Sequence, residues 1–206
     1  MLGLKAVAYD VLGRRFERTH GARLRRQQLA AARGRVIEIG AGTGANLPHY
    51  PDDVTELVLT EPNEAMLKRL RRRASAGGRG VSVLQAPAEA LPFDDGSFDT
   101  AVATVVLCSV PSQSDALREV RRVLRPGGQF LFAEHVRSAD PRRARWQDRL
   151  SRPWSVIADG CHPNRETLAA IESAGFVVQE LERSELPVGP KLVRPYVLGR
   201  AVTPPA

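Results

Sequence analysis

Cysteine is scarce in this sequence, which has two cysteines among 206 residues. Cys108 and Cys161 stand far apart in the chain, and neither belongs to a C-x-x-C pair of the kind that binds zinc. Secreted proteins held together by disulfide frameworks carry several cysteines in a short chain. The sequence therefore argues against a structural disulfide and against a metal site.

Long hydrophobic runs are missing as well. The longest, Ala101 to Val110, is broken by threonine, and it is far shorter than the ~20 apolar residues that cross a bilayer as a helix. Met1 to Val11 contains Lys5 and Asp10 and has no continuous apolar core, so it does not have the pattern of a signal peptide. We therefore expect a cytoplasmic protein without a transmembrane segment.

Aromatic residues make up only 5% of the sequence, whereas the formal net charge is +7. Such a charge attracts nucleic-acid backbones, but few aromatic rings remain for stacking on bases. Most arginines recur at helical spacing beside alanine and leucine, which is typical of solvated helix faces. The sequence thus argues against a nucleic-acid partner.

The length fits one domain with a small lid. Residues 1–33 have a broken helical pattern, and we expect them to form an N-terminal helical lid in which Tyr9 contacts the substrate. Residues 34–206 would form the main domain. Because no recognition domain is inserted, the expected partner is a small molecule, and the protein would be a monomer or a homodimer.

A glycine-rich loop follows the first apolar run, since residues 36–45 read V-I-E-I-G-A-G-T-G-A. The β-branched residues of this run suit a buried strand. Gly40, Gly42 and Gly44 lack a Cβ, so the chain can turn tightly and a ligand can lie against the backbone. We expect a helix to begin here and to direct its free N–H groups at the ligand.

Two carboxylates help to decide which ligand the loop takes, because G-A-G-T-G-A also fits the dinucleotide fingerprint of an NAD-dependent oxidoreductase. Glu38 lies inside the predicted strand, where an NAD-binding fold would have an apolar residue. A cationic ligand such as S-adenosylmethionine would give Glu38 a partner. Glu61 follows the apolar run Leu57 to Thr60, where it can accept hydrogen bonds from ribose hydroxyls.

Apolar runs and amphipathic stretches alternate along the rest of the chain. We expect strands at 57–60, 81–84, 100–107 and 129–134, helices at 64–70, 114–124 and 165–174, and a helix stop and turn at 125–128. Asn164 is the candidate N-cap of the helix at 165–174. The alternation predicts an α/β fold with a parallel, doubly wound sheet.

Four motifs occur in order: E-I-G-A-G-T-G at 38–44, E-P-N at 61–63, A-E-A-L-P-F-D-D-G-S-F-D at 88–99 and L-R-E-V-R-R-V-L-R-P-G-G at 117–128. Together they resemble the class I S-adenosylmethionine-dependent methyltransferases. The resemblance implies a Rossmann-like, seven-stranded sheet with helices on both faces and an antiparallel last strand. The two C-terminal strands would be 176–181 and 193–202. V-L-C-S-V at 106–110, E-H-V at 134–136, D-G-C-H-x-N-R-E-T at 159–167 and V-R-P-Y at 193–196 are similar to the alkyl thiol methyltransferase group.

The resemblance implies S-adenosylmethionine as the cofactor. The glycine loop and the residues near it would hold the methionine part, the acid after the second strand would bind ribose, and later residues would line the adenine. The cofactor-binding residues implied in this way are Glu38, Gly40, Ala41, Gly42, Gly44, Asn46, Glu61, Pro62, Met66, Ala88, Glu89 and Thr104.

One position departs from the family pattern. The family usually has an aspartate after the third strand to accept the adenine amino group, and this chain has Pro87 there. Proline cannot make that bond, so the contact must shift to Gln85, to Glu89 or to water. Otherwise cofactor binding weakens by about 1–2 kcal/mol.

The candidate catalytic residues follow the predicted fourth and fifth strands, where parallel sheets place substrates. His135 is the candidate base or orienting group, with a structural histidine as the alternative. Asp159 and His162 follow the amphipathic stretch 146–157, which would cap the acceptor pocket. The substrate-pocket residues would be Tyr9, Cys108, Trp154 and Arg194, although Cys108 and Trp154 also suit plain packing.

The sequence therefore predicts an S-adenosylmethionine-dependent methyltransferase that acts on a small, largely apolar acceptor. A thiol is the leading acceptor, because a thiol with a pKa of about 8.5 is already partly ionised. The alternative is O-, N- or C-methylation of a phenol, an amine or a quinone. Pro87 motivates a further alternative, a non-catalytic cofactor-binding module that acts as a partner or regulator.

Overall fold

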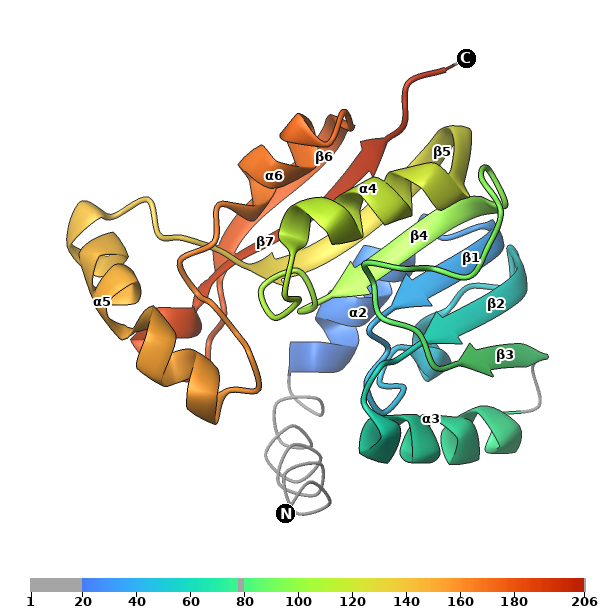
Figure 1. The fold of residues 1–206 in the computed structure, drawn as a ribbon, viewed down its shortest axis with the longest axis horizontal. Helices are drawn as coiled ribbons and strands as arrows, with labels where there is room; N and C mark the ends of the chain where they lie inside the picture. Colours follow the sequence, from blue (N-terminus) through green and yellow to red (C-terminus); the bar gives the residue numbers. More distant parts are fainter. Residues whose placement is uncertain (1–19, 78–79, 206) are drawn as a thin grey trace.

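The computed structural model describes residues 20–77 and 80–205, and its centre is a seven-stranded sheet (Figure 1). The strand order is β3-β2-β1-β4-β5-β7-β6. β7 runs antiparallel to both of its neighbours, and the other pairs are parallel. The strands are β1 Gly34–Ile39, β2 Val54–Thr60, β3 Val81–Leu84, β4 Phe98–Thr104, β5 Leu124–His135, β6 Val177–Glu185 and β7 Pro195–Val202. The Rossmann-like sheet with an antiparallel last strand is thus confirmed.

Helices cover both faces of the sheet (Figure 1). The α-helices are α2 Ala22–Leu29, α3 Glu64–Ala76, α4 Gln113–Val123, α5 Pro141–Ile157 and α6 Thr167–Ser173, and η2 Leu47–His49 and η3 Lys191–Val193 are short 3-10 helices. Leu29 of α2 and Leu67 of α3 belong to one buried cluster, and Leu117 of α4 and Ile171 of α6 belong to the other. α5 projects beyond the end of β5, away from both layers.

The alternation of side chains along β1 divides its residues between the two layers. Val36 packs in the cluster of α2 and α3, whereas Ile37 and Ile39 pack in the cluster of α4 and α6. Glu38 has the parity of Val36 and is 3% exposed, so a carboxyl group lies within an otherwise apolar layer. Because β1 and β4 are adjacent, the glycine loop opens at the point where the strand order reverses, which is where such sheets bind ligands.

The prediction of a helix directly after the glycine loop is wrong. Residues 42–46 form turns, and the three-residue η2 is the only helical element between β1 and β2. Gly40, Gly42 and Gly44 all have positive φ, a conformation that cannot continue into a right-handed helix. The N–H groups of the turn, and not a helix dipole, are therefore what this loop offers a ligand.

Several element boundaries also differ from the prediction, and three of them affect the site. β4 ends at Thr104 because Val105 has φ +58°. Residues 125–128 lie within β5, where the pairing with β4 shifts register between Phe98 and Thr100. α6 begins at Thr167 without a side-chain cap.

Of the predicted lid, the structure describes only residues 20–33, and Tyr9 lies outside the described residues. Within that part, Gln28 of α2 donates to the carbonyls of Ala103 and Leu131, so α2 is anchored to β4 and β5. None of the helices in the described residues is long and apolar enough to cross a membrane.

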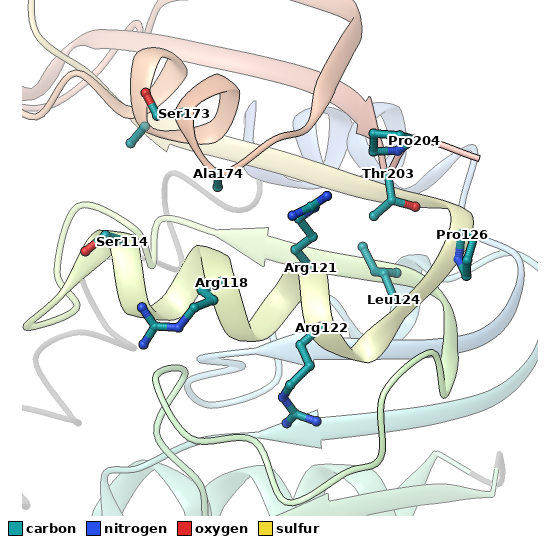
Figure 2. A pocket seen from close by; sticks show the side chains of 11 residues that line it. Ser114, Arg118, Arg121, Arg122, Leu124, Pro126, Ser173, Ala174, Thr203 and Pro204 are labelled. Carbon is teal, nitrogen blue, oxygen red and sulfur yellow. The ribbon is translucent and has the colours of Figure 1, made fainter. Parts of the chain in front are cut away.

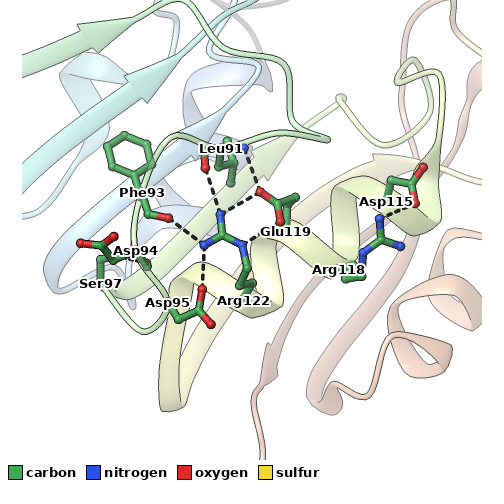
Figure 3. A network of polar contacts seen from close by, with 9 residues as sticks. All are labelled: Leu91, Phe93, Asp94, Asp95, Ser97, Asp115, Arg118, Glu119 and Arg122. Carbon is green, nitrogen blue, oxygen red and sulfur yellow. Dashed lines mark hydrogen bonds and ion pairs between the residues drawn. The ribbon is translucent and has the colours of Figure 1, made fainter.

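Two of the recognised motifs meet through one arginine (Figure 3). Arg122 of α4 donates to the carbonyls of Leu91 and Phe93, at 2.9 and 2.7 Å, and pairs with Glu119 and Asp95. The hydrogen bond from Arg122 holds the pKa of Glu119 below its usual range. This network joins the loop after β3 to the C-terminal end of α4.

Candidate active site

The three glycines of the loop after β1 serve different purposes. A Cβ on Gly40 would lie 2.8 Å from the side chain of Val106, and one on Gly44 would lie 2.8 Å from Leu47 and Leu70. A Cβ on Gly42 would meet nothing within 4 Å. Gly40 and Gly44 therefore permit close packing within the protein, and Gly42 presents bare backbone to open space.

Glu38 is held by two hydrogen bonds within the protein. Its carboxylate accepts from the amide of Asn46 at 2.9 Å and from the hydroxyl of Tyr50 at 2.6 Å. Burial raises the pKa of Glu38 to about 7, against the opposing effect of the Tyr50 hydrogen bond. Glu38 therefore does not require a cationic ligand as its partner, because Asn46 and Tyr50, which flank η2, supply two donors.

Asn46 is the centre of this polar network. Its side chain accepts from Arg25 at 2.7 Å and donates to both Glu38 and Thr104, each at 2.9 Å. Thr104 in turn donates to Gln28 at 2.9 Å. The network connects α2 to the carboxyl ends of β1 and β4, so the predicted cofactor residues Glu38, Asn46 and Thr104 lie together.

Glu61 stands at the end of β2 beside the glycine loop. One carboxylate oxygen accepts from the Gly42 N–H at 2.8 Å, and the other accepts from the Asn63 N–H at 2.9 Å. Asn63 also caps α3, which begins one residue later. Burial raises the pKa of Glu61, and the charge of Asp159 raises it further. The loop containing Asp159 lies at the same end of the sheet, since the adjacent Gly160 approaches the backbone of Ser109 in the loop after β4.

Three further predicted cofactor-binding residues follow β2 and β3 in the sequence. Met66 is half-buried in the first turn of α3, and Pro62 is exposed. Ala88 is 5% exposed in the loop after β3. Ala41 uses its N–H internally, in a 2.8 Å bond to the Thr60 carbonyl.

The side chains that could replace the missing aspartate are both engaged. Gln85 donates to the Pro62 carbonyl at 3.1 Å. Glu89 accepts from the Ser112 N–H at 3.2 Å. The amide oxygen of Gln85 takes no part in its bond, and the Glu89 oxygen that accepts from Ser112 retains a further lone pair. Neither bond therefore prevents a contact with an adenine amino group.

Glu134 is a residue of the site that sequence reasoning missed. It is fully buried in β5, and its carboxylate accepts from the N–H groups of Val106, Leu107 and Cys108 at 2.9–3.3 Å. Burial raises its pKa to about 7. The available signal was an acid inside an apolar strand, the same signal that singled out Glu38.

Arg165 also binds the loop after β4, the loop whose N–H groups donate to Glu134. Its guanidinium donates to the carbonyls of Leu107 and Val110. Val105, with φ +58°, begins the segment that Glu134 and Arg165 fix between them. A β-branched residue with positive φ is strained, and such strain persists only where the surroundings over-determine the backbone.

His135 ends β5 next to this loop. Its ring lies edge-on to Tyr196 with 6.1 Å between the ring centroids, and it hydrogen-bonds to the backbone of Val193. Nδ1 has no hydrogen-bond partner in the part of the chain that is described. Burial lowers the pKa of His135, so the imidazole is neutral at pH 7 and can accept a proton.

Asp159 and His162, the other predicted catalytic residues, lie in the loop after α5. Asp159 is exposed with φ +51°, a conformation that aspartate tolerates. His162 shares a 3.0 Å hydrogen bond with Ser151, and its backbone N–H donates to the Cys108 carbonyl at 2.7 Å. Asn164 binds Ser151 and Asp148 and does not cap α6, contrary to the prediction.

The substrate-pocket candidates are only partly brought together. Cys108 and Cys161 are both free and buried, and a hydrogen bond between their thiols raises the pKa of Cys108 and lowers that of Cys161. Their separation in the sequence gave no sign of this contact. Trp154 is half-buried on α5. Arg194 donates to the Gly189 carbonyl at 2.9 Å, so it stabilises the turn before β7.

A hollow of about 820 Å³ lies apart from the glycine loop and the predicted site residues (Figure 2). It is open between α4, α6 and the residues that follow β7, at the opposite end of the sheet from the glycine loop. Arg118 and Arg122 at its rim already pair with Asp115, Glu119 and Asp95. None of the predicted site residues lines it.

Comparisons with known proteins agree with the geometry of the crevice. Residues 37–132 match the family Methyltransf_11, a methyltransferase domain. The human thiol S-methyltransferase TMT1A is 38% identical over 183 residues, which cover 85% of this chain and 74% of the relative. The human thiol S-methyltransferase TMT1B is 40% identical over 84% of this chain and 73% of the relative. The crystal structure of the YcgJ protein of Bacillus subtilis superimposes with a TM-score of 0.73 at 20% identity, over 91% of this chain and 100% of that one.

Proposed function

This chain belongs to the S-adenosylmethionine-dependent methyltransferases of the Methyltransf_11 family, and we propose that it methylates the sulfur of small, largely apolar thiols. The observation that carries the proposal is the similarity to thiol S-methyltransferases over most of the chain, which extends well beyond the cofactor-binding motifs. The family and the crevice set the reaction class, and the thiol is the proposed acceptor.

The residues at the carboxyl end of the sheet fit the cofactor. Gly42 leaves open space beside its backbone, where a side chain would intrude. Each oxygen of Glu61 accepts one N–H and retains a lone pair, so the carboxylate can accept two ribose hydroxyls. When bound, S-adenosylmethionine supplies a methyl group on a sulfonium. Met66 and Ala88 would line the adenine, and Asn46 and Thr104 would border the methionine part.

The acceptor side needs a proton acceptor and a fixed loop. His135 provides an imidazole whose Nδ1 is buried and has no hydrogen-bond partner among the described residues, and this ring would take the thiol proton. Glu134 and Arg165 act as positioning residues, because they fix the segment 105–110 on which the acceptor would lie. Positioning of this kind supplies about 7–11 kcal/mol of the barrier when reacting groups are aligned.

The experiment that tests the proposal is methylation of an acceptor panel. The purified protein is incubated with S-adenosylmethionine and matched alkyl thiols, phenols, amines and quinones, and products are read by mass spectrometry. We expect methyl gain on alkyl thiols, rising with their apolar surface. Methylation of the phenol, amine or quinone with no reaction of any thiol would reject the proposed acceptor and leave the reaction class intact.

A further inference from the structure

The outer face of α5 exposes large apolar side chains. Trp146 is 57% exposed, Leu150 40%, Val156 74% and Ile157 73%. Trp146, Leu150 and Ile157 recur at helical spacing and form one stripe. The buried residues Ala144, Gln147 and Ser151 occupy a different side of the helix. We call the exposed stripe, with Val156 beside it, the α5 outer face.

Four arginines flank this stripe: Arg142, Arg145, Arg149 and Arg152 are all exposed. No acidic side chain among the described residues pairs with any of them. The Arg149 guanidinium lies over the Trp146 ring at 5.8 Å. The α5 outer face thus combines apolar surface with uncompensated positive charge, a combination that favours an anionic interface.

α5 is held firmly, so this exposure is built into the fold. The amide of Gln147 donates to the carbonyls of Val136, Pro163 and Leu192 at 2.9–3.1 Å. Arg143 pairs with Glu185 of β6. The helix cannot turn its apolar stripe inward without breaking these bonds.

We propose that the α5 outer face docks on the surface of a membrane that contains anionic lipids. Tryptophan suits the interface between headgroups and acyl chains, and arginine is attracted to anionic headgroups. A second copy of the chain is a poorer occupant, because a two-fold interface would set the four arginines against their own counterparts. The helix lies on the bilayer and does not span it.

Docking there would bring the membrane close to the candidate site. Ser151, on the inner side of α5, hydrogen-bonds to His162, whose backbone contacts Cys108. An apolar acceptor dissolved in the lipid would therefore enter beside α5, a consequence that rests on the proposed function. The docking itself does not depend on which acceptor is methylated.

Vesicle cosedimentation tests the proposal with the full-length protein. Vesicles of phosphatidylcholine alone are compared with vesicles that also contain phosphatidylglycerol. We expect binding to the anionic vesicles that falls as salt is raised. Replacing Arg145 and Arg149 by glutamine should lower the partition coefficient about thirtyfold. Trp146→Gln with Ile157→Gln should lower it by about tenfold or more.

Two control variants carry equivalent changes elsewhere. Arg71→Gln with Arg72→Gln on α3 removes the same charge, and Val177→Thr with Leu181→Thr on β6 removes exposed apolar surface. Both should bind vesicles as the unaltered protein does. Equal binding by the α5 variants, or no binding to anionic vesicles, would overturn the proposal. Self-association that the α5 variants abolish, without vesicle binding, would assign the face to a second copy instead.

Discussion

At the scale of single residues, the first two glycines of the loop, Gly40 and Gly42, should respond differently to replacement by alanine. Gly40→Ala drives a methyl group against Val106 at positive φ, and we expect a loss of about 2–4 kcal/mol in the free energy of unfolding. Gly42→Ala meets open space, so its stability cost should be the ~1–2 kcal/mol of the backbone conformation alone. Urea unfolding of both variants measures the difference.

The same two variants distinguish a glycine required for packing from a glycine required for cofactor binding. If Gly42 faces the cofactor, Gly42→Ala should weaken S-adenosylmethionine binding by about tenfold or more while the protein remains folded. Titration calorimetry on the folded variant measures this. Unchanged affinity would contradict the assignment of Gly42 to the cofactor.

The buried acid Glu38 should make stability depend on pH. Burial raises its pKa to about 7 from the ordinary 4.5 of a glutamate, so the folded state retains the proton over a range in which the unfolded state has lost it. Stability therefore falls as pH rises from about 5 to 7, by up to ~3 kcal/mol for this group. Urea unfolding at pH 5 and pH 8 should show a smaller difference for Glu38→Gln than for the unaltered protein.

Glu134 has the same raised pKa of about 7, so it adds a fall of the same sign. The fall should persist in part in Glu38→Gln and should be smaller still in the double variant with Glu134→Gln, in which the raised pKa of Glu61 still contributes. Stability that rises between pH 5 and 7 would contradict the burial of both acids in the folded state.

His135 should set the rate of methyl transfer if it takes the acceptor's proton. Because burial lowers its pKa, the neutral form prevails at pH 7, and the rate should fall only on the acid side. His135→Gln should lower kcat about 100-fold, with little change in S-adenosylmethionine affinity. Steady-state kinetics between pH 5 and 9 measure both effects. An unaltered acid limb in the variant would show that the histidine is structural.

At the scale of elements, Arg122 joins the loop after β3 to α4, and its removal should loosen that junction. Arg122→Ala leaves the carbonyls of Leu91 and Phe93 without their donor and Glu119 without its partner, so we expect a loss of about 2–3 kcal/mol. Asp95, whose side chain is 81% exposed, is the control, and Asp95→Ala should cost less than ~1 kcal/mol. Thermal unfolding compares the two.

The elements themselves were largely predictable, and their ends were not. Apolar runs placed the five parallel strands β1 to β5, because central parallel strands are buried on both faces and need continuous apolar sequence. The mostly exposed β6 and the antiparallel β7 were predicted from the family resemblance. The helix expected after the glycine loop failed because three positive-φ glycines leave only a short connection before β2. The early end of β4 at Thr104 depends on the conformation of Val105, which Glu134 and Arg165 impose from distant parts of the chain. No local pattern encodes such a constraint.

Some residues of the candidate site were likewise predictable from the sequence, and others were not. Glu38, Gly42 and Glu61 could be found from the sequence, because an acid inside a strand and a glycine after it are local signals. The internal partners of Glu38, the three N–H groups on Glu134 and the contact between Cys108 and Cys161 join segments that are remote in the chain. Only the folded arrangement reveals them.

At the scale of the whole molecule, the candidate site lies at the carboxyl end of the sheet. The carboxyl ends of β1, β2, β4 and β5 bring together the glycine loop, Glu61, the strained Val105 and His135. α5 and the loop that follows it border the same end and present an arginine-rich, apolar face outward. Cofactor, acceptor and membrane would thus all meet the protein on one side, whereas the large hollow between α4 and α6 lies apart.

Titration calorimetry of the unaltered protein and Glu61→Ala with S-adenosylmethionine and with NAD tests whether the glycine loop and Glu61 bind S-adenosylmethionine. We expect the unaltered protein to bind S-adenosylmethionine and not NAD. We also expect Glu61→Ala to weaken the binding by about tenfold or more, because the ribose hydroxyls lose a charged acceptor. Binding of NAD, or equal affinity of both proteins for S-adenosylmethionine, would contradict this assignment.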